Sequence, residues 1–267
     1  MTARSQDAAI FHALHRDFLI LPNAWDAASA KLIERAGARA IATSSAAVAW
    51  AHGYADGHDL PIAKLVTTVE EIARVTALPI TCDAEGGYAD DPARVAENVA
   101  ALIGAGAVGI NLEDGRESHD LHLRKVEAAR VAAERAGVAL YINARTDVFL
   151  KKLVAPEQAL QETIRRGCAL KSAGASGYFV PFAMAPDDIR AIAGAVDLPL
   201  NIMGWPGIPD QAALWTLGAR RLSAATWMFR AAASALAETA SAFLRTGDCE
   251  ALAGAADRTD FDALMRG

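Results

Sequence analysis

Short runs of apolar residues alternate along the chain with segments in which apolar residues follow a helical spacing. This alternation is typical of buried strands that are each followed by an amphipathic helix. The strand-like runs are Phe18–Leu21, Ala38–Ala42, Leu78–Cys82, Val108–Leu112, Val138–Ile142, Gly177–Val180, Leu198–Ile202 and Arg220–Ser223.

The segments between these runs carry the start and stop signals of helices. Proline opens several of them and glycine follows the ends of others, as expected at a helix start and just beyond a helix end. The predicted helices are Asp26–Ala36, Pro92–Ala105, Leu121–Ala136, Pro156–Ala173, Pro186–Ala195 and Pro209–Leu217.

Eight strands alternating with helices, without a long linker, predict a single (β/α)8 TIM-barrel domain over residues 1–267. A doubly wound sheet would need a glycine-rich phosphate turn after an early strand, and Leu21–Asp26 is not one. Beyond the eighth strand, Thr226–Arg245 is an alanine-rich helical segment and Glu250–Arg266 is predicted as another helix. This C-terminal extension, residues 226–267, either packs on its own barrel or is exchanged between subunits.

Composition narrows the class of protein. The chain has 267 residues, of which 53% are hydrophobic and 22% charged, as in ordinary soluble enzymes. The net charge of −6 argues against a nucleic-acid or anionic-membrane partner. No apolar run approaches the roughly 18–20 residues of a membrane helix, and the N-terminus lacks a signal-peptide core. We therefore expect a cytoplasmic protein with a small-molecule substrate.

The three cysteines are too far apart to suggest a disulfide framework or a zinc cluster. Cys82 is adjacent to an acidic pair, so a catalytic thiol is one interpretation. Strand alternation, however, directs it away from Asp83 and Glu85. We therefore expect Cys82 to be a buried, small apolar residue.

The acidic pair itself is the most informative local pattern. Asp83 and Glu85 stand two residues apart after the apolar run Leu78–Cys82, and Gly86 and Gly87 follow. On a strand, side chains two apart point to the same face, so the two carboxylates would project together. They repel each other unless a cation or a shared proton lies between them. A divalent metal ion is the first interpretation.

Other polar residues fall at the predicted strand ends, where barrel enzymes place their chemistry. They are Asn23, Ser44, Ser45, Glu113, Asp114, Asn143, Arg145, Asp147 and Asn201. Acids facing an arginine suit a metal and an anionic, oxygen-rich substrate. Two alternatives stay open: Asp114 or Asp147 could simply cap a helix, and Arg145 could be a structural partner of Glu113. The convergence of so many polar groups favours a functional site.

Four of these segments resemble, in order and position, motifs of the isocitrate lyase/phosphoenolpyruvate mutase superfamily. They are Asn23–Ala30, Asp83–Tyr88, Asn111–Asp114 and Asn143–Asp147. The resemblance extends from about Leu21 to Ser223. It implies a (β/α)8 barrel that binds Mg2+ or Mn2+ at its mouth and acts on 2-oxo acids or related enolates.

The resemblance also implies roles for individual residues. Asp83 would lie nearest the metal, and several other acids would reach it through water. The implied metal-site residues are Asp83, Glu85, Asp56 and Glu113. The implied substrate-binding residues are Ser44, Ser45, Ala46, Asp83, Arg145 and Asn201.

Two departures from the family pattern bear on the reaction. The segment Gly115–Lys125 lacks the cysteine of the Lys-Cys-Gly-His loop that family lyases use as an acid, and Val180-Pro181-Phe182 lacks the histidine of phosphonate-handling members. An imidazole has a suitable pKa for proton transfer, so His119 or His122 is a candidate replacement donor. The expected catalytic residues are Arg145, Glu113 and His119.

The leading interpretation is a Mg2+-dependent lyase that cleaves or decarboxylates a small 2-oxo acid or 2-hydroxy dicarboxylate through an enolate. One alternative is a phosphonopyruvate/phosphoenolpyruvate-type mutase or hydrolase. A second alternative is a barrel that binds 2-oxo acids with little catalysis. The family's habit of exchanging a terminal helix predicts a homo-oligomer, either a tetramer or a dimer.

Overall fold

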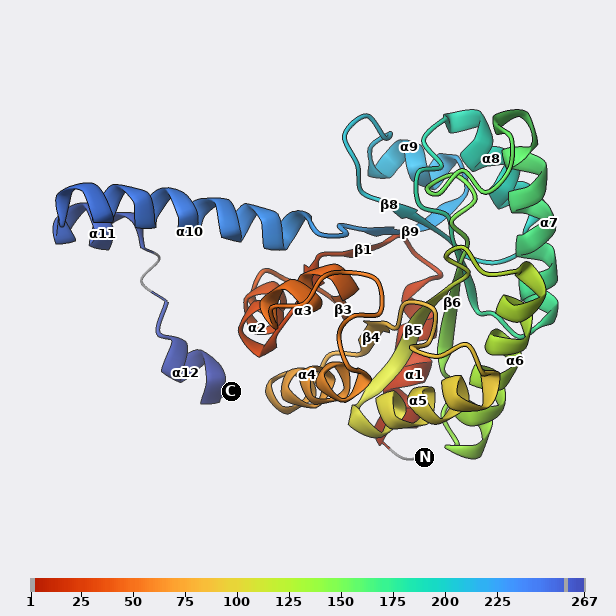
Figure 1. Cartoon of the computed structure of the whole chain (residues 1–267), viewed down its shortest axis with the longest axis horizontal. Helices are drawn as coiled ribbons and strands as arrows, with labels where there is room; N and C mark the ends of the chain where they lie inside the picture. The colour runs from red at the N-terminus through yellow and green to blue at the C-terminus, as the bar shows by residue number, and fades with distance from the viewer. Residues whose placement is uncertain (1–2, 257–258, 267) are drawn as a thin grey trace.

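Parallel strands form a nearly closed barrel with helices on its outer side (Figure 1). The computed structural model describes residues 3–256 and 259–266. Within those residues the strands are β1 (Leu19–Leu21), β2 (Asn23–Ala24), β3 (Ile41–Thr43), β4 (Ile80–Asp83), β5 (Ala107–Glu113), β6 (Tyr141–Arg145), β7 (Gly177–Phe179), β8 (Leu200–Met203) and β9 (Ala219–Ser223). The predicted α/β barrel is confirmed.

Barrel closure depends on the first strand, which proline divides into two short pieces. β1 pairs with β9 and β2 pairs with β3, both in parallel. Pro22 lies between the pieces, and it has no backbone N–H to donate to a neighbouring strand. β1 and β2 therefore act as two halves of one barrel strand, which gives eight positions around the ring.

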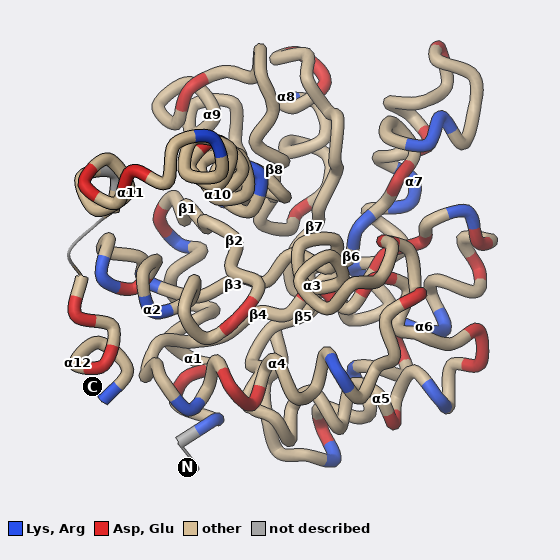
Figure 2. Tube along the Cα trace, turned by 60° about the vertical axis from the view of Figure 1, so that its left-hand side comes forward, with Lys and Arg blue, Asp and Glu red and all other residues tan. Residues whose placement is uncertain are grey.

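The helices agree with most of the expected segments. The described chain contains α1 (Ala3–Leu14), α2 (Ala27–Arg35), α3 (Ser45–Ala51), α4 (Ile62–Val75), α5 (Pro92–Ala105), α6 (His119–Arg135), α7 (Ala159–Ser172), α8 (Pro186–Ala195), α9 (Gln211–Thr216), α10 (Trp227–Thr246), α11 (Cys249–Ala255) and α12 (Phe261–Arg266), with a 3-10 turn at Pro156–Gln158. Acidic and basic residues are interspersed along the outer helices in the view of Figure 2. None of the described helices has the length and hydropathy required to cross a bilayer.

The C-terminal extension differs from its prediction in one respect. The prediction of a single helix over Glu250–Arg266 is wrong. α11 and α12 are separate helices, and each has its own N-terminal cap. Asp248 accepts hydrogen bonds from the first turn of α11, and Asp260 accepts one from Ala263 in α12. Residues 257 and 258 of the predicted helix lie outside the described residues. Before this break, α10 projects from the barrel and buries none of its side chains (Figure 1).

The N-terminal helix α1 closes the end of the barrel at which the strands begin. Phe11 of α1 is fully buried and packs edge-to-face on Tyr141, with 5.3 Å between ring centroids. Gly109, near the start of β5, provides the space, since a Cβ there would lie 2.8 Å from the Phe11 ring. The helix therefore fills the end of the barrel where the strands begin, and the strand ends at the other side remain open.

We predict that Phe11→Ala lowers the free energy of unfolding by about 3–5 kcal/mol, because it leaves a cavity under the barrel. Denaturant unfolding followed by circular dichroism measures this change. Ile10→Ala is the matched control, since Ile10 is its neighbour on α1 and is 43% exposed. Equal losses in the two variants would contradict the role assigned to α1.

Candidate functional site

Strand register brings the predicted polar residues to one end of the barrel. Asp83 of β4 is paired with Asn111 of β5, and two residues further along β5, Glu113 is paired with Arg145 of β6. Because the strands are parallel, their carboxyl ends meet at the same rim. The rim therefore carries the acids and the arginine together, as the sequence suggested.

Asp83 is the most firmly held of these acids. One carboxylate oxygen accepts hydrogen bonds from the Ser45 backbone N–H at 3.1 Å and from the Ser45 hydroxyl at 2.7 Å. The other oxygen accepts from the Asn111 side-chain amide at 3.4 Å. Ser44 caps α3 and so fixes the turn that presents Ser45. Asp83 is therefore anchored both by the start of α3 and by the neighbouring strand β5.

A cavity of about 420 Å³ opens beside Asp83 at the barrel mouth. We call it the main cavity. Six of the residues implied by the resemblance line it, and they are Ser44, Ser45, Ala46, Asp56, Asp83 and Arg145. The structure thus brings the implied substrate-binding segment, two of the implied metal-site acids and the arginine to one space.

Arg145 is held in an ion-pair cluster. Its guanidinium lies 2.6 Å from a carboxylate oxygen of Glu113 and 2.7 Å from one of Asp147. Burial lowers the pKa of Arg145, but these two acids raise it by more, so the side chain stays charged. Lys151 joins the cluster 2.9 Å from Asp147. The structural pairing considered for Arg145 is thus present, and the same side chain also lines the main cavity.

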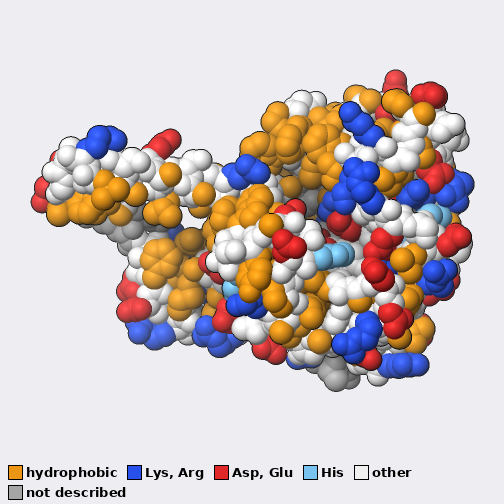
Figure 3. Space-filling view, viewed as in Figure 1, with side chains coloured by type: hydrophobic (Ala, Val, Ile, Leu, Met, Phe, Trp, Pro, Cys, Tyr) orange, Lys and Arg blue, Asp and Glu red, His pale blue; other side chains and the backbone are white. Residues whose placement is uncertain are grey.

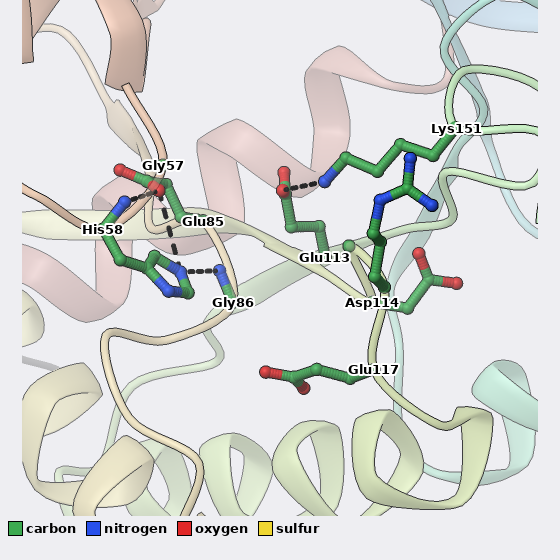
Figure 4. Close-up of a pocket in the computed structure, with 10 residues that line it drawn as sticks. Gly57, His58, Glu85, Gly86, Glu113, Asp114, Glu117 and Lys151 are labelled. Atoms are coloured by element: carbon green, nitrogen blue, oxygen red, sulfur yellow. Dashed lines mark hydrogen bonds and ion pairs between the residues drawn. The ribbon is translucent and has the colours of Figure 1, made fainter. Parts of the chain in front are cut away.

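Glu85 lies differently from its prediction. β4 ends at Asp83, and Glu85 follows in a left-handed conformation with φ 48°, so the two acids do not share one strand face. The Glu85 carboxylate accepts hydrogen bonds from the His58 backbone N–H at 2.6 Å and the Tyr88 hydroxyl at 2.9 Å. It lines a second cavity of about 390 Å³, which Glu113 and Lys151 also line (Figure 4).

Burial and neighbouring carboxylates disfavour the ionised forms of three acids at the mouth. Burial raises the pKa of Glu85 to about 7, and the nearby Asp83 and Asp56 contribute. Burial also raises the pKa of Asp56, again with help from Asp83. Burial raises the pKa of Glu113, although Arg145 opposes this. A divalent cation among these groups would favour their ionised forms.

The donor set fits a hard, hydrated cation. The four candidate acids supply only oxygen ligands, as Mg2+ prefers. Among the described residues, no three His, Cys, Asp or Glu side chains are arranged to hold an ion directly. Mg2+ usually keeps several waters and binds through one or two carboxylates, so this spacing suits an ion that reaches some of the acids through water.

The structure does not bring the two candidate histidines to the mouth. His119 begins α6 and lines neither of the two cavities described above. Burial, aided by Arg165 and Arg166, lowers its pKa to about 4, so it is neutral near pH 7. His122 is fully buried, with its Nε2 3.0 Å from the Leu112 carbonyl oxygen. The expectation that either one donates the proton is therefore not supported by placement.

Two further predicted residues lie inside the barrel wall. Asn201 is fully buried in β8, where its amide donates to the Ser223 hydroxyl at 3.3 Å, so it reaches the main cavity only through Ser223. Cys82 is fully buried, and burial raises its pKa to about 12. This agrees with the expectation of a small buried residue rather than a thiol nucleophile.

Sequence reasoning missed most of the apolar lining of the main cavity. The missed lining residues are Trp50, Leu150, Phe179, Phe182, Met203 and Trp205, together with Arg230. Apolar residues are ordinarily assigned to a core, so only structure shows that these face a cavity. Phe182 gives one visible signal, since it replaces a histidine of the family pattern, and its φ of 63° is unusual for a bulky residue.

Comparisons with known proteins agree with this geometry. The sequence signature of the phosphoenolpyruvate phosphomutase family matches residues 11–244. An uncharacterized protein of Mycobacterium tuberculosis is 34% identical over 87% of this chain and 88% of its own length. An oxaloacetate decarboxylase of Paraburkholderia xenovorans is 28% identical over 82% of this chain and 76% of its own length.

Solved structures show the same architecture. A Burkholderia cenocepacia J2315 protein, provisionally assigned as a phosphonomutase, is 40% identical over 92% of this chain and all of its own, with a TM-score of 0.85. A phosphonopyruvate hydrolase, solved with oxalate and Mg2+, is 22% identical over 98% of this chain and 95% of its own, also with a TM-score of 0.85. The second likeness shows the fold alone.

We predict that iodoacetamide alkylates Cys168 of the native protein and leaves Cys82 unmodified. The Cys168 thiol is exposed, whereas burial keeps Cys82 protonated and inaccessible. Peptide mass spectrometry measures the extent at each site, and denatured protein modified at all three positions is the control. Rapid native alkylation of Cys82 would reopen the catalytic-thiol interpretation.

Proposed function

Because the chain belongs to the phosphoenolpyruvate mutase/isocitrate lyase superfamily, we propose that it is a Mg2+-dependent lyase that acts on small 2-oxo acids. Oxaloacetate-like compounds are the simplest substrates. The main support is the shared lining of one cavity by an anchored Asp83, by Asp56 and by the charged Arg145. These groups can hold a cation and an anionic acid side by side.

In this proposal Asp83 and Asp56 hold the metal from the main cavity, and Glu85 and Glu113 hold its water shell from the second cavity. Mn2+ would bind the same oxygen ligands. When bound, the ion would polarise the 2-oxo group and stabilise the enolate that remains after bond cleavage. The relative solved with oxalate and Mg2+ supports such a pairing of ligand and metal.

The chain's own residues would orient the acid. The segment Ser44–Ala46 lines the main cavity beside Asp83 and would contact the substrate's carboxylate or oxo end. Arg145 remains charged and would clamp the anionic group. Glu113 would hold the guanidinium in place through their ion pair.

The proton source favours decarboxylation within this proposal. The residues that line the main cavity include no histidine or cysteine, which are common side-chain acids for protonating an enolate. After decarboxylation, solvent can supply that proton to a small enolate. We therefore favour decarboxylation of an oxaloacetate-type acid over cleavage that needs a cysteine acid.

We predict that Asp83→Asn and Arg145→Met each lower Mg2+-dependent formation of pyruvate from oxaloacetate by about 100-fold or more, because each removes a group that binds the reacting anion or its cation. Proton NMR measures the rate above the background of metal alone. Addition of EDTA should reduce the wild-type rate to the metal-free level. His119→Ala should stay within a few-fold of wild type, since that side chain is away from the cavity.

Asp187→Asn is the matched control, because Asp187 lies in an exposed ion pair on α8. Release of phosphate or a new phosphorus resonance from phosphonopyruvate, without decarboxylation, would favour the mutase or hydrolase alternative, which the provisionally assigned phosphonomutase supports. Binding of 2-oxo acids without turnover of a broad panel would favour the non-catalytic alternative.

We also propose that the protein is a homo-oligomer in which residues 226–267 of this single-domain chain contact a second copy. Apolar side chains gather along the projecting helix (Figure 3). Leu236 and Leu244 of α10 are 71% and 85% exposed. A solvated apolar face of this kind gains stability by burial against a partner.

We predict that the double variant Leu236→Asp/Leu244→Asp has a lower molar mass in solution than wild type, because charges oppose burial of this face. Light scattering coupled to gel filtration measures the mass. Ser234→Asp, at an exposed polar position on another side of the same helix, should leave it unchanged. A monomeric wild-type protein would refute the proposed assembly.

A further inference from the structure

The residues that line the main cavity fall into two chemically different sets, which we call the polar half and the apolar half. The polar half is formed by Ser44, Ser45, Asp56, Asp83, Asn111 and Arg145. The apolar half is formed by Trp50, Leu150, Phe179, Phe182, Met203 and Trp205. The polar half, together with Glu85 and Glu113 of the second cavity, supplies the residues that the proposed chemistry uses, so the apolar half calls for a separate explanation.

Phe182 and Trp205 of the apolar half belong to a packed aromatic surface. The rings of Phe182 and Trp205 lie 4.9 Å apart, and those of Trp205 and Trp227 lie 5.3 Å apart. The Trp227 indole donates a hydrogen bond to the Gly204 carbonyl oxygen at 2.9 Å, which ties α10 to the loop that carries Trp205. These contacts give the aromatic wall a defined shape.

The boundary between the halves is also defined. The Arg145 guanidinium lies 5.6 Å from the centroid of the Phe179 ring. A ligand whose anionic end meets Arg145 would therefore have its remaining chain directed along the aromatic wall. Phe182 extends that wall from a left-handed backbone, a conformation that persists where surrounding contacts enforce it.

The volume of the cavity also favours a ligand larger than a four-carbon acid. Its volume of about 420 Å³ falls within the range of roughly 300–1,000 Å³ that is typical of sites for drug-sized ligands. A four-carbon acid at the polar half would leave the aromatic wall in contact with water. That arrangement forgoes the favourable burial of apolar surface.

We propose that the substrate is an oxaloacetate-type 2-oxo acid with a branched-alkyl or aryl group on C3, and that this group packs on the wall formed by Phe179, Phe182 and Trp205. The C3–C4 bond breaks, C4 leaves as CO2, the bonding electrons remain as the enolate, and a solvent proton at C3 gives the branched or aryl 2-oxo acid. The inference rests on the proposed function and specifies its substrate class. The carboxylate and oxo group lie at the polar half, and the apolar group occupies the aromatic half. The shape of this wall and the apolar surface buried against it then determine which side group is preferred.

Arg230 is a second arginine that lines the main cavity. Its guanidinium lies 5.1 Å from the Trp50 ring centroid, and its Nε donates to the Thr226 hydroxyl at 3.1 Å. Stacking of this kind lets an arginine form part of an aromatic surface. A substrate whose side group carries a further carboxylate would instead pair with Arg230, and the experiment separates these outcomes.

The test measures binding by isothermal titration calorimetry with excess Mg2+. The ligands are oxalate, pyruvate, 4-methyl-2-oxopentanoate, phenylpyruvate and 2-oxoglutarate. We expect the branched and aromatic acids to bind about 10-fold or more tightly than pyruvate, because each buries additional apolar surface. Phe182→Ala and Trp205→Ala should bring that ratio close to one. Trp215→Ala is the control, since Trp215 is an exposed tryptophan of α9 outside the main cavity and should keep the wild-type ratio.

The outcomes distinguish this inference from the function on which it rests. If oxalate and pyruvate bind but the larger acids bind no better, the aromatic wall is not a substrate site and the proposed function stands. Strongest binding by 2-oxoglutarate would also overturn the inference, in favour of Arg230 as an anion site. If no acid binds with Mg2+, both the inference and the proposed function are wrong.

Discussion

Unbalanced negative charge at the barrel mouth is the constraint on which the site depends. Parallel strand ends bring several carboxylates together, and burial makes their ionised forms costly. Arg145 and Lys151 pair with Glu113 and Asp147. Among the described residues, Asp56 and Asp83 have no arginine or lysine in an ion pair. A hydrated divalent cation would supply the missing positive charge with the oxygen ligands that are already in place.

Buried hydrogen bonds and ion pairs hold the loops around these acids in place. The fully buried Lys125 of α6 donates to the Gly86 carbonyl oxygen at 2.9 Å and to Glu117 at 2.6 Å. It therefore ties the loop after β4 to the loop after β5, which is the segment that lacks the family's cysteine. Asp114 accepts hydrogen bonds from Thr146 and from Arg166, both near 2.7 Å. These buried contacts form a firm rim on one side of the cavities.

The sequence predicted much of the fold and of the polar half of the site, because strand periodicity and helix punctuation are local signals. Pro92–Ala105 and Pro186–Ala195 were predicted to the residue. The same-face argument for Asp83 and Glu85 was wrong, because the strand ended between them. His119 was misplaced, since its neighbours come from α7, more than forty residues away. The aromatic wall could not be predicted for the same reason, because Phe179, Phe182 and Trp205 come to line one cavity only after folding.

The most direct test of the metal-centred account is the affinity of the protein for Mn2+, measured by electron paramagnetic resonance with and without oxalate. The account predicts that wild-type protein binds Mn2+, that oxalate strengthens this binding, and that Asp83→Asn weakens it by about 10-fold or more. Asp187→Asn should behave as wild type. Failure of the wild-type protein to bind Mn2+ in the presence of oxalate, or equal affinity in Asp83→Asn, would contradict the account.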